Sequence, residues 1–323
     1  MKNIHWLVPQ KVKDPDDISH SNLASVRLRA GLFNQSVFKN YKVNFNESIS
    51  NFKEIDILFV GKFSANREDL FDKWLDYIEK LRKLGKKIYF DYTDNHLDFA
   101  TLPSKFYNEA IKKDDSIITS SKKLKTHLTH KFKNVTVIED PIEIEIQKIK
   151  KNNSNRFLFF GHPTNLKYLF ELIPFWDQSK SYDLIIQTSD DGLNFIQEHS
   201  KFIQKPSNLQ IHLQRWSIAN MIRESDLSSG VIIPGDINDK RKNGVSHNRL
   251  ITAFSLGLPV SATKYDSYLE FDNQFADIDN KKEFINFLKN PSLFRSRVMM
   301  AQKKVKNFTK ENLAGKWLRL ITN

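Results

Sequence analysis

Residues 243–263, NGVSHNRLITAFSLGLPVSAT, combine a helix pattern and a strand pattern in one short segment. From about residue 246 onwards apolar side chains recur at helical spacing, among them Leu250 and Phe254. The pattern stops at Gly257, a residue suited to the C-terminal end of a helix, and an apolar strand pattern follows at 259–262. A helix that leads directly into a buried strand is typical of a parallel α/β sheet.

The start of this helix is a candidate anion-binding site. The first backbone N–H groups of a helix have no partners within it, and the helix dipole places positive charge there. Asn248 and Arg249 fall within the first turn, where their side chains would meet a phosphate or a sugar hydroxyl. An ordinary helix–strand unit, in which Gly-Leu-Pro ends the helix and starts the strand, explains the same pattern without a ligand.

The alternation of strands and helices extends over nearly the whole chain. In the first half we predict strands at 4–8, 55–60, 87–92, 116–119 and 135–138, and helices at 21–38, 67–84 and 121–131. In the second half we predict strands at 156–160, 184–187, 209–213, 230–233 and 259–262, and helices at 164–173, 191–203, 217–224, 246–256 and 280–289. A Lys- and Asn-rich stretch at 147–155 between the halves is interpreted as a linker, and a helical tail spans 292–321.

This organisation predicts an α/β fold of two doubly wound domains, residues 1–146 and 156–291. A C-terminal helix at 292–323 would cross back to the first domain. Such domains bind ligands at the carboxyl ends of their strands, so the sequence predicts a cleft between the two sheets.

Composition narrows the function. The chain has 323 residues and a net charge of +12, but its cations are 38 Lys and only 12 Arg, which weakens a nucleic-acid interpretation. The lack of Cys excludes disulfides, cysteine nucleophiles and thiolate metal sites. No apolar run approaches the roughly 20 residues of a membrane span, so we expect a soluble, cytoplasmic protein whose charge allows peripheral contact with an anionic membrane.

Other ligand motifs are missing from the sequence. There is no GxxxxGK[ST] and no early GxGxxG, which disfavours nucleoside-triphosphate hydrolysis and nicotinamide chemistry. No spacing of His, Asp and Glu suggests a metal site.

The run Asn248-Arg249-Leu250, followed by Ala253 and by Gly257-Leu258-Pro259-Val260, resembles the C-terminal signature of GT-B glycosyltransferases, particularly family 4-like members. The resemblance covers about 85 to 275 and includes the strand predicted at 209–213 and the segment 157–161, each with the residues after it. It implies two Rossmann-like domains, an acceptor-binding N-terminal one and a nucleotide-sugar-binding C-terminal one. It also implies retention of anomeric configuration, a glycan, lipid-linked or small-molecule acceptor, and no cofactor beyond the nucleotide sugar. GT-B transfer needs no bound metal, because basic side chains and helix ends neutralise the leaving diphosphate.

The chain departs from the family 4 pattern at two positions. Members usually carry two Glu residues eight apart, which help to hold the donor sugar and its ribose, and here Gly244 and Thr252 stand at those positions. We count Thr252 among the candidate donor-binding residues. Two alternatives therefore stay open: a non-catalytic nucleotide- or carbohydrate-binding protein with the same fold, and a DNA-modifying glycosyltransferase.

Three further residues of the second half are candidates for donor binding. Gly161 follows a strand and lets a ligand approach the backbone, and Lys167 on the next helix would reach a diphosphate as a point charge. In the resemblance this is the donor pyrophosphate site. Arg215 follows the strand at 209–213, near the base or diphosphate by resemblance, whereas Trp216 is interpreted as a core residue.

The first half offers an acceptor or phosphate ligand and a catalytic cluster. Arg27 and Arg29 point about 200° apart on a helix, and we choose Arg27 because it lies nearer the helix start. Asp91 or Asp94 would orient an acceptor hydroxyl or act as base after the strand at 87–92, and His96 would transfer protons. A helix cap at Asp94 or Asn95 and a solvent-exposed His96 explain the same residues.

Overall fold

The structure is a computed structural model that describes residues 1–199, 201, 203–242 and 244–322. Parts of the predictions that fall on residues 200, 202, 243 and 323 lie outside the described residues. The chain divides into two compact units. Unit 1 comprises Met1–Pro141, Gly244–Ser246 and Phe308–Asn323, and unit 2 comprises Ile142–Asn243 and His247–Asn307.

Unit 1 contains a six-stranded parallel sheet with strand order β2-β1-β3-β4-β5-β6. The strands are β1 (Lys2–Leu7), β2 (Tyr41–Asn46), β3 (Ile57–Val60), β4 (Lys87–Tyr92), β5 (Ser116–Thr119) and β6 (Asn134–Val137). The five strands predicted for this half are all present. The edge strand β2 is not predicted, because its sequence YKVNFN alternates polar and apolar residues instead of forming a continuous apolar run.

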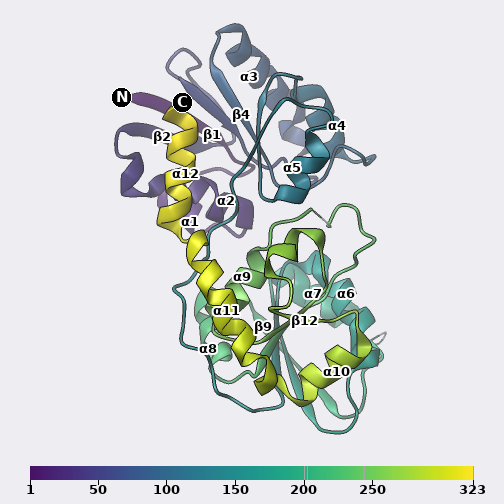
Figure 1. The fold of residues 1–323 in the computed structure, drawn as a ribbon. Coiled ribbons are helices and arrows are strands. Elements are labelled where there is room, and N and C mark those ends of the chain that lie inside the picture. The colour runs from purple at the N-terminus through teal and green to yellow at the C-terminus, as the bar shows by residue number, and fades with distance from the viewer. Residues whose placement is uncertain (200, 202, 243, 323) are drawn as a thin grey trace. The chain divides into compact units, whose positions relative to one another are not determined.

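The helices of unit 1 lie on both faces of its sheet (Figure 1). They are α1 (Asp16–Ser19), α2 (Ala24–Leu28), α3 (Phe71–Lys83), α4 (Leu102–Ala110), α5 (Lys122–Leu128) and α12 (Lys310–Thr322), with 3-10 turns η1 (Ala30–Asn34), η2 (Ser36–Phe38) and η3 (Glu68–Leu70). The single helix predicted at 21–38 is wrong: α2 is followed by η1 and η2. Gly31, Asn34 and Ser36 all favour turns over a continued helix.

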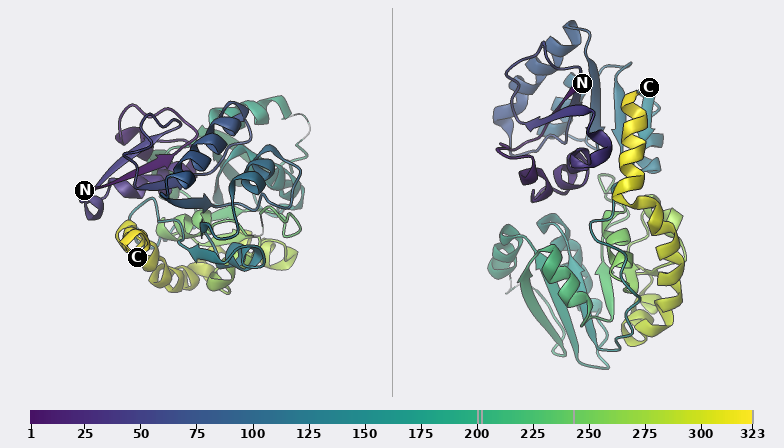
Figure 2. Two further views of the ribbon diagram at one scale, coloured as in Figure 1. Left: turned by 90° about the horizontal axis from the view of Figure 1, so that it is seen from above. Right: turned by 90° about the vertical axis from the view of Figure 1, so that its left-hand side faces the viewer.

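Unit 2 contains a second six-stranded parallel sheet, with strand order β12-β11-β10-β7-β8-β9. Its strands are β7 (Arg156–Phe160), β8 (Tyr182–Thr188), β9 (Leu209–Arg215), β10 (Gly230–Ile233), β11 (Val260–Ala262) and β12 (Ala276–Asp277). Its helices are α6 (Leu166–Leu172), α7 (Asp190–His199), α8 (Ile218–Ser225), α9 (Asn248–Ser255), α10 (Lys281–Lys289) and α11 (Arg295–Val305), with shorter turns η4 (Pro163–Asn165), η5 (Ile173–Phe175), η7 (Asp266–Phe271) and η8 (Pro291–Phe294). The turn η9 (Lys306–Phe308) includes the point where the chain passes from unit 2 to unit 1. Helices again cover both faces of the sheet (Figure 2). The predicted α/β class with two doubly wound sheets is confirmed.

The stretch at 147–155 is an extended segment packed on unit 2 and does not behave as a loose linker. The backbone N–H groups of Gln147 and Lys150 donate to the carbonyls of Ser255 and Gly257, at 2.7 and 2.9 Å. Gly257 has a φ of +76°, and a Cβ there would come within 2.2 Å of the Lys148 carbonyl oxygen. A glycine is therefore required at the end of α9 for two reasons, its backbone conformation and the close passage of this segment.

The C-terminal tail is two helices where the sequence predicts one. α11 lies in unit 2 and α12 in unit 1. Thr309 begins α12: its carbonyl accepts from the Leu313 N–H at 3.1 Å, and its hydroxyl accepts from the Asn312 N–H at 3.4 Å. A threonine that caps a new helix interrupts the helical pattern, which periodicity alone does not show.

α12 completes the core on one face of the unit 1 sheet (yellow in Figure 1). The fully buried Trp317 packs with Trp6 of β1, their ring centroids 5.4 Å apart, and with Phe33 at 5.5 Å and Phe59 at 5.6 Å. Over the described residues, no helix has the length and apolar character needed to cross a bilayer.

Candidate functional site

The most distinctive polar arrangement in unit 2 joins the end of β7 to the start of α9. Gly161 directly follows β7, a central strand of the sheet, and Arg249 is the second residue of α9. A Cβ on Gly161 would lie 3.4 Å from Arg249 Nη1 and 3.4 Å from Asn165 Nδ2. We call the place at Gly161 between these two nitrogens the Gly161 notch. Two N–H donors thus flank a position where this residue has no side chain.

Arg249 is held in place but keeps one donor for another partner. Its guanidinium hydrogen-bonds to the side chain of Tyr268, which is fully buried, and burial raises the pKa of Tyr268. Its Nη1 atom is buried and has no hydrogen-bond partner within the described residues. Leaving a buried cationic N–H without an acceptor is costly, so this geometry favours an anionic oxygen in the notch.

Asn248 and Thr252, both predicted as donor ligands, contact each other along α9. The Thr252 hydroxyl donates to Asn248 Oδ1 at 3.0 Å, and Thr252 is buried. Thr252 therefore orients the Asn248 side chain one helical turn before it.

The other two predicted cations of unit 2 have different partners. Lys167, on α6, has its Nζ 4.0 Å from Asp239 Oδ2 and 4.4 Å from the ring centroid of Tyr168. Arg215 is the last residue of the edge strand β9, not a loop residue, and it pairs with Asp190 at 3.1 Å on the surface. Of the three predicted cations, Arg249 is the one placed at Gly161 by the described contacts. Trp216, interpreted as a core residue, is only half-buried.

Asp239 forms a polar cluster that the sequence did not reveal. Its carboxylate accepts from the Tyr168 hydroxyl at 2.7 Å and from Arg241 at 3.1 Å. Burial alone would raise the pKa of Asp239, but the hydrogen bonds from Arg241 and Tyr168 outweigh it and lower the pKa to about 2. Asp239 therefore stays ionised and holds the side chains of the neighbouring α6 residues Lys167 and Tyr168.

In unit 1, Asp94 and His96 share the turn that follows β4. Asp94 forms an ion pair with Lys62 and is about a quarter exposed. The His96 backbone N–H donates to the Tyr92 hydroxyl at 2.6 Å, and its ring stacks on Tyr107 at a centroid distance of 5.7 Å. Neither residue caps a helix, since α4 begins later with Thr101 as its cap.

The candidate ligand predicted from the sequence is Arg27, whereas Arg29 is buried in unit 1. It is fully buried, and its guanidinium binds Asp91 at 2.7 Å and Asp140 at 2.9 Å. Burial opposes its charge, but the two carboxylates outweigh burial and raise the pKa of Arg29. Asp91 is buried as the partner of Arg29, and its role as a base stays a prediction. Arg27 is half-buried and donates to the Ser21 carbonyl at 2.6 Å.

The structure resembles several solved structures over its whole length. HepE from Anabaena, solved in complex with UDP-glucose, aligns with a TM-score of 0.63 and 12% identity, covering 100% of both chains. An α-glucosyltransferase (AGT) in complex with UDP aligns with a TM-score of 0.64 and 10% identity, again covering 100% of both. The chain has the GT-B fold.

A third GT-B structure, TarM of S. aureus, aligns with a TM-score of 0.59 and 14% identity over 83% of this chain. This chain covers 55% of TarM, so it spans about half of that protein's length. At these identities the likeness concerns the fold alone. No protein-family model matches the sequence, and no curated protein matches it.

Proposed function

We propose that this chain is a glycosyltransferase and that unit 2 binds its nucleotide-sugar donor at the Gly161 notch. The observation that carries the proposal is the buried Nη1 of Arg249, which lacks a partner within the described residues and lies beside Gly161. The notch follows a central strand at its carboxyl end, where open α/β sheets bind ligands. That HepE and AGT were solved with UDP-glucose and UDP supports this choice of donor.

In this proposal the notch acts on the leaving group. Transfer breaks the bond between the anomeric carbon and the diphosphate oxygen and forms a bond from that carbon to an acceptor oxygen, whose proton goes to a base. The diphosphate gains negative charge as it leaves, and N–H donors fixed in advance stabilise that charge with little reorganisation. Arg249 and Asn165 supply such donors, and Lys167 adds a positive charge on the neighbouring helix.

Thr252, one of the two positions that differ from the family 4 pattern, has a role in the same proposal. The hydroxyl of Thr252 is engaged by Asn248, so Thr252 acts through Asn248 rather than on the ligand. We propose that Asn248 contacts the sugar or ribose of the donor, and that the anomeric configuration is retained, as the family 4 resemblance implies.

On the acceptor side we propose Asp94 as the better candidate for orienting or deprotonating a hydroxyl. It is a partly exposed carboxylate, whereas the His96 ring packs on Tyr107. The favoured acceptor is a glycan or lipid-linked saccharide.

A second candidate function is glycosylation of DNA. AGT was also solved in complex with UDP and a 13-mer DNA that contains an HMU base, and the two chains cover each other completely. The net charge of +12 is compatible with a polyanionic acceptor.

The test is release of UDP from UDP-glucose, measured without acceptor, with oligosaccharides and with a duplex that contains 5-hydroxymethyluracil. A catalyst releases UDP faster than buffer and is stimulated by its acceptor, and proton NMR of the product gives the anomeric configuration. Arg249→Lys should lower kcat/KM about a hundredfold, since an ammonium cannot reproduce the guanidinium fork. If the protein binds UDP-glucose but releases no UDP with any of these acceptors, the chain is a non-catalytic binding protein.

A further inference from the structure

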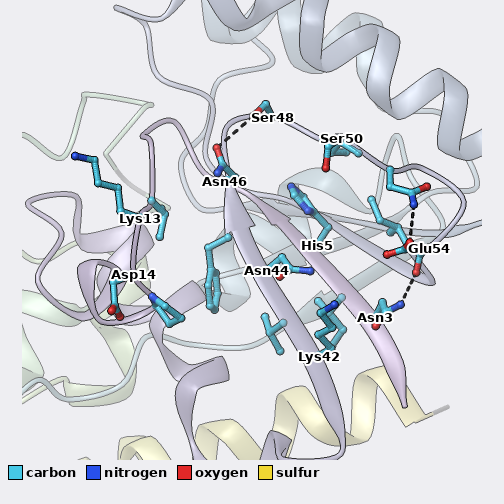
Figure 3. Close-up of a pocket in the computed structure, with 18 residues that line it drawn as sticks. Asn3, His5, Lys13, Asp14, Lys42, Asn44, Asn46, Ser48, Ser50 and Glu54 are labelled. Carbon is cyan, nitrogen blue, oxygen red and sulfur yellow. Dashed lines mark hydrogen bonds between the residues drawn. The ribbon is translucent and has the colours of Figure 1, made fainter.

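Unit 1 contains a cavity of about 410 Å³ at the open edge of its sheet, far along the chain from the residues of the notch. We call it the edge-strand cavity. It is lined by residues 3–5, 12–15, 42–46, 48–51 and 54–55. Figure 3 shows Lys42, Asn44 and Asn46 along β2, with His5, Ser50 and Glu54 on one side of that strand. Its volume lies within the range of small-molecule sites, roughly 300 to 1,000 Å³.

The register of β1 and β2 explains why this cavity is polar. His5 is paired with Asn44 and Asn3 with Lys42, so these four side chains share one face of the two edge strands. The residues that alternate with them, such as Trp6, pack in the apolar core of the opposite face. A polar face on two adjacent strands is unusual in a parallel sheet, where both faces are normally apolar.

His5 is the buried polar residue of this face. The residue is 7% exposed, and its ring hydrogen-bonds to the backbone of Asn46. Its Nε2 atom is buried with no hydrogen-bond partner within the described residues. Burial lowers the pKa of His5 to about 4, so the ring is neutral near pH 7. Since the bond to Asn46 raises the pKa, the ring nitrogen there donates to a carbonyl, and Nε2 is left as an acceptor.

The remaining lining residues indicate what kind of ligand would bind in the cavity beside His5. The charged side chains are Lys13 and Lys42 against Asp14 and Glu54, so the lining carries no net charge. This balance favours neither a phosphate nor a cation. Buried Ile49 and Ile55 add apolar surface beside the polar groups.

We propose that the edge-strand cavity is a saccharide-binding site, in which His5 Nε2 accepts a hydrogen bond from a sugar hydroxyl and Asn44 binds a neighbouring hydroxyl. A neutral sugar supplies both hydroxyl donors and an apolar C–H face, which matches this lining. All residues that line the cavity belong to unit 1, whereas those of the notch belong to unit 2. The saccharide site goes beyond the proposed function and does not depend on it.

The test is calorimetric titration of the full chain with glucose, galactose, N-acetylglucosamine and maltose. We expect at least one of these sugars to bind with a Kd of about 1 mM. His5→Leu removes the acceptor and Asn44→Ala removes the exposed amide, and each should weaken that binding about tenfold or more. Asn40→Ala is the matched control, because Asn40 is an exposed asparagine just before β2 and does not line the cavity. It should leave binding unchanged.

The outcomes separate this site from the donor site. Sugar binding that survives both His5→Leu and Asn44→Ala but is lost in Arg249→Met would place the sugar at the notch and overturn the proposal. The absence of binding by every sugar of the set would also overturn it. Asn44 is exposed, so Asn44→Ala tests the site even if His5→Leu does not fold.

Discussion

Arg249 Nη1 lies 3.4 Å from the point where a side chain on Gly161 would begin. Gly161 directly follows the central strand β7, and Arg249 lies in the first turn of α9, which follows a different strand, so the fold alone brings them together. The contact joins two motifs that the sequence identified separately. It gives the proposed donor site a geometry that substitutions can test.

Gly161→Ala should weaken binding of UDP while leaving the protein folded. The new methyl group would make contacts of 3.4 to 3.5 Å, which the structure accommodates, but it would occupy the notch between Arg249 and Asn165. We expect UDP affinity to fall about tenfold, measured by calorimetry, with little change in melting temperature. Gly315→Ala is the control: it lies in α12 with its nearest contact at 3.7 Å, and it should gain about 0.5–1 kcal/mol of stability without affecting UDP. Unchanged UDP affinity in Gly161→Ala would count against the notch.

Arg29→Met should strongly destabilise unit 1. Removal of the guanidinium leaves Asp91 and Asp140 buried without their cation, and breaking a buried ion pair in this way costs about 3–5 kcal/mol. Arg27→Met removes the hydrogen bond to the Ser21 carbonyl but leaves no buried carboxylate without its cation, and should cost about 1 kcal/mol. Urea unfolding followed by tryptophan fluorescence compares the two variants. Equal losses would mean that Arg29 has no special structural role.

Trp317→Ala should destabilise the protein by about 3–5 kcal/mol, because it leaves a large cavity against Trp6, Phe33 and Phe59. Arg319→Ala, on the exposed side of the same helix, should change stability by less than about 0.5 kcal/mol. Thermal unfolding measures both. A mild effect of Trp317→Ala would show that α12 is not part of the unit 1 core.

His5 should make stability depend on pH between about 4 and 6.5. Burial lowers the pKa of His5 from 6.5 to about 4 in the folded protein. Between these two pH values His5 is protonated in the unfolded chain and stays neutral in the folded chain. The stabilisation is complete above pH 6.5 and falls as the pH drops towards 4, by about 2 kcal/mol at pH 5. His5→Leu lacks this dependence, so the free energy of unfolding of wild type minus that of the variant should fall by about 2 kcal/mol from pH 7 to pH 5. A constant difference would show that His5 titrates normally.

The sequence predicted most strands because a strand buried on both faces is a continuous run of apolar residues, as in β7 with RFLFF. The strand β2 was not predicted, because one of its faces is polar, and that same face lines the edge-strand cavity. β12 has only two residues, too few for a pattern. The two strands that were not predicted, β2 and β12, lie at sheet edges, and a local sequence pattern does not show where a strand lies in its sheet.

The site was predictable only in part, for a similar reason. Gly161 and Arg249 stand out from local spacing, but their contacts with Asn165 and Tyr268 depend on how β7, η4, α9 and η7 pack. Helical periodicity separated Arg27 from Arg29 without showing which was buried, because that depends on Asp91 and Asp140 from distant segments.

The most direct test of the donor site compares UDP with uridine on wild type and on Arg249→Met. If Arg249 Nη1 and Asn165 bind the diphosphate, wild type should bind UDP about a hundredfold more tightly than uridine, because charge-assisted hydrogen bonds form only with UDP. Arg249→Met should reduce that ratio about tenfold or more while leaving uridine affinity nearly unchanged. Equal affinities for UDP and uridine in wild type, or the same ratio in Arg249→Met, would contradict the account.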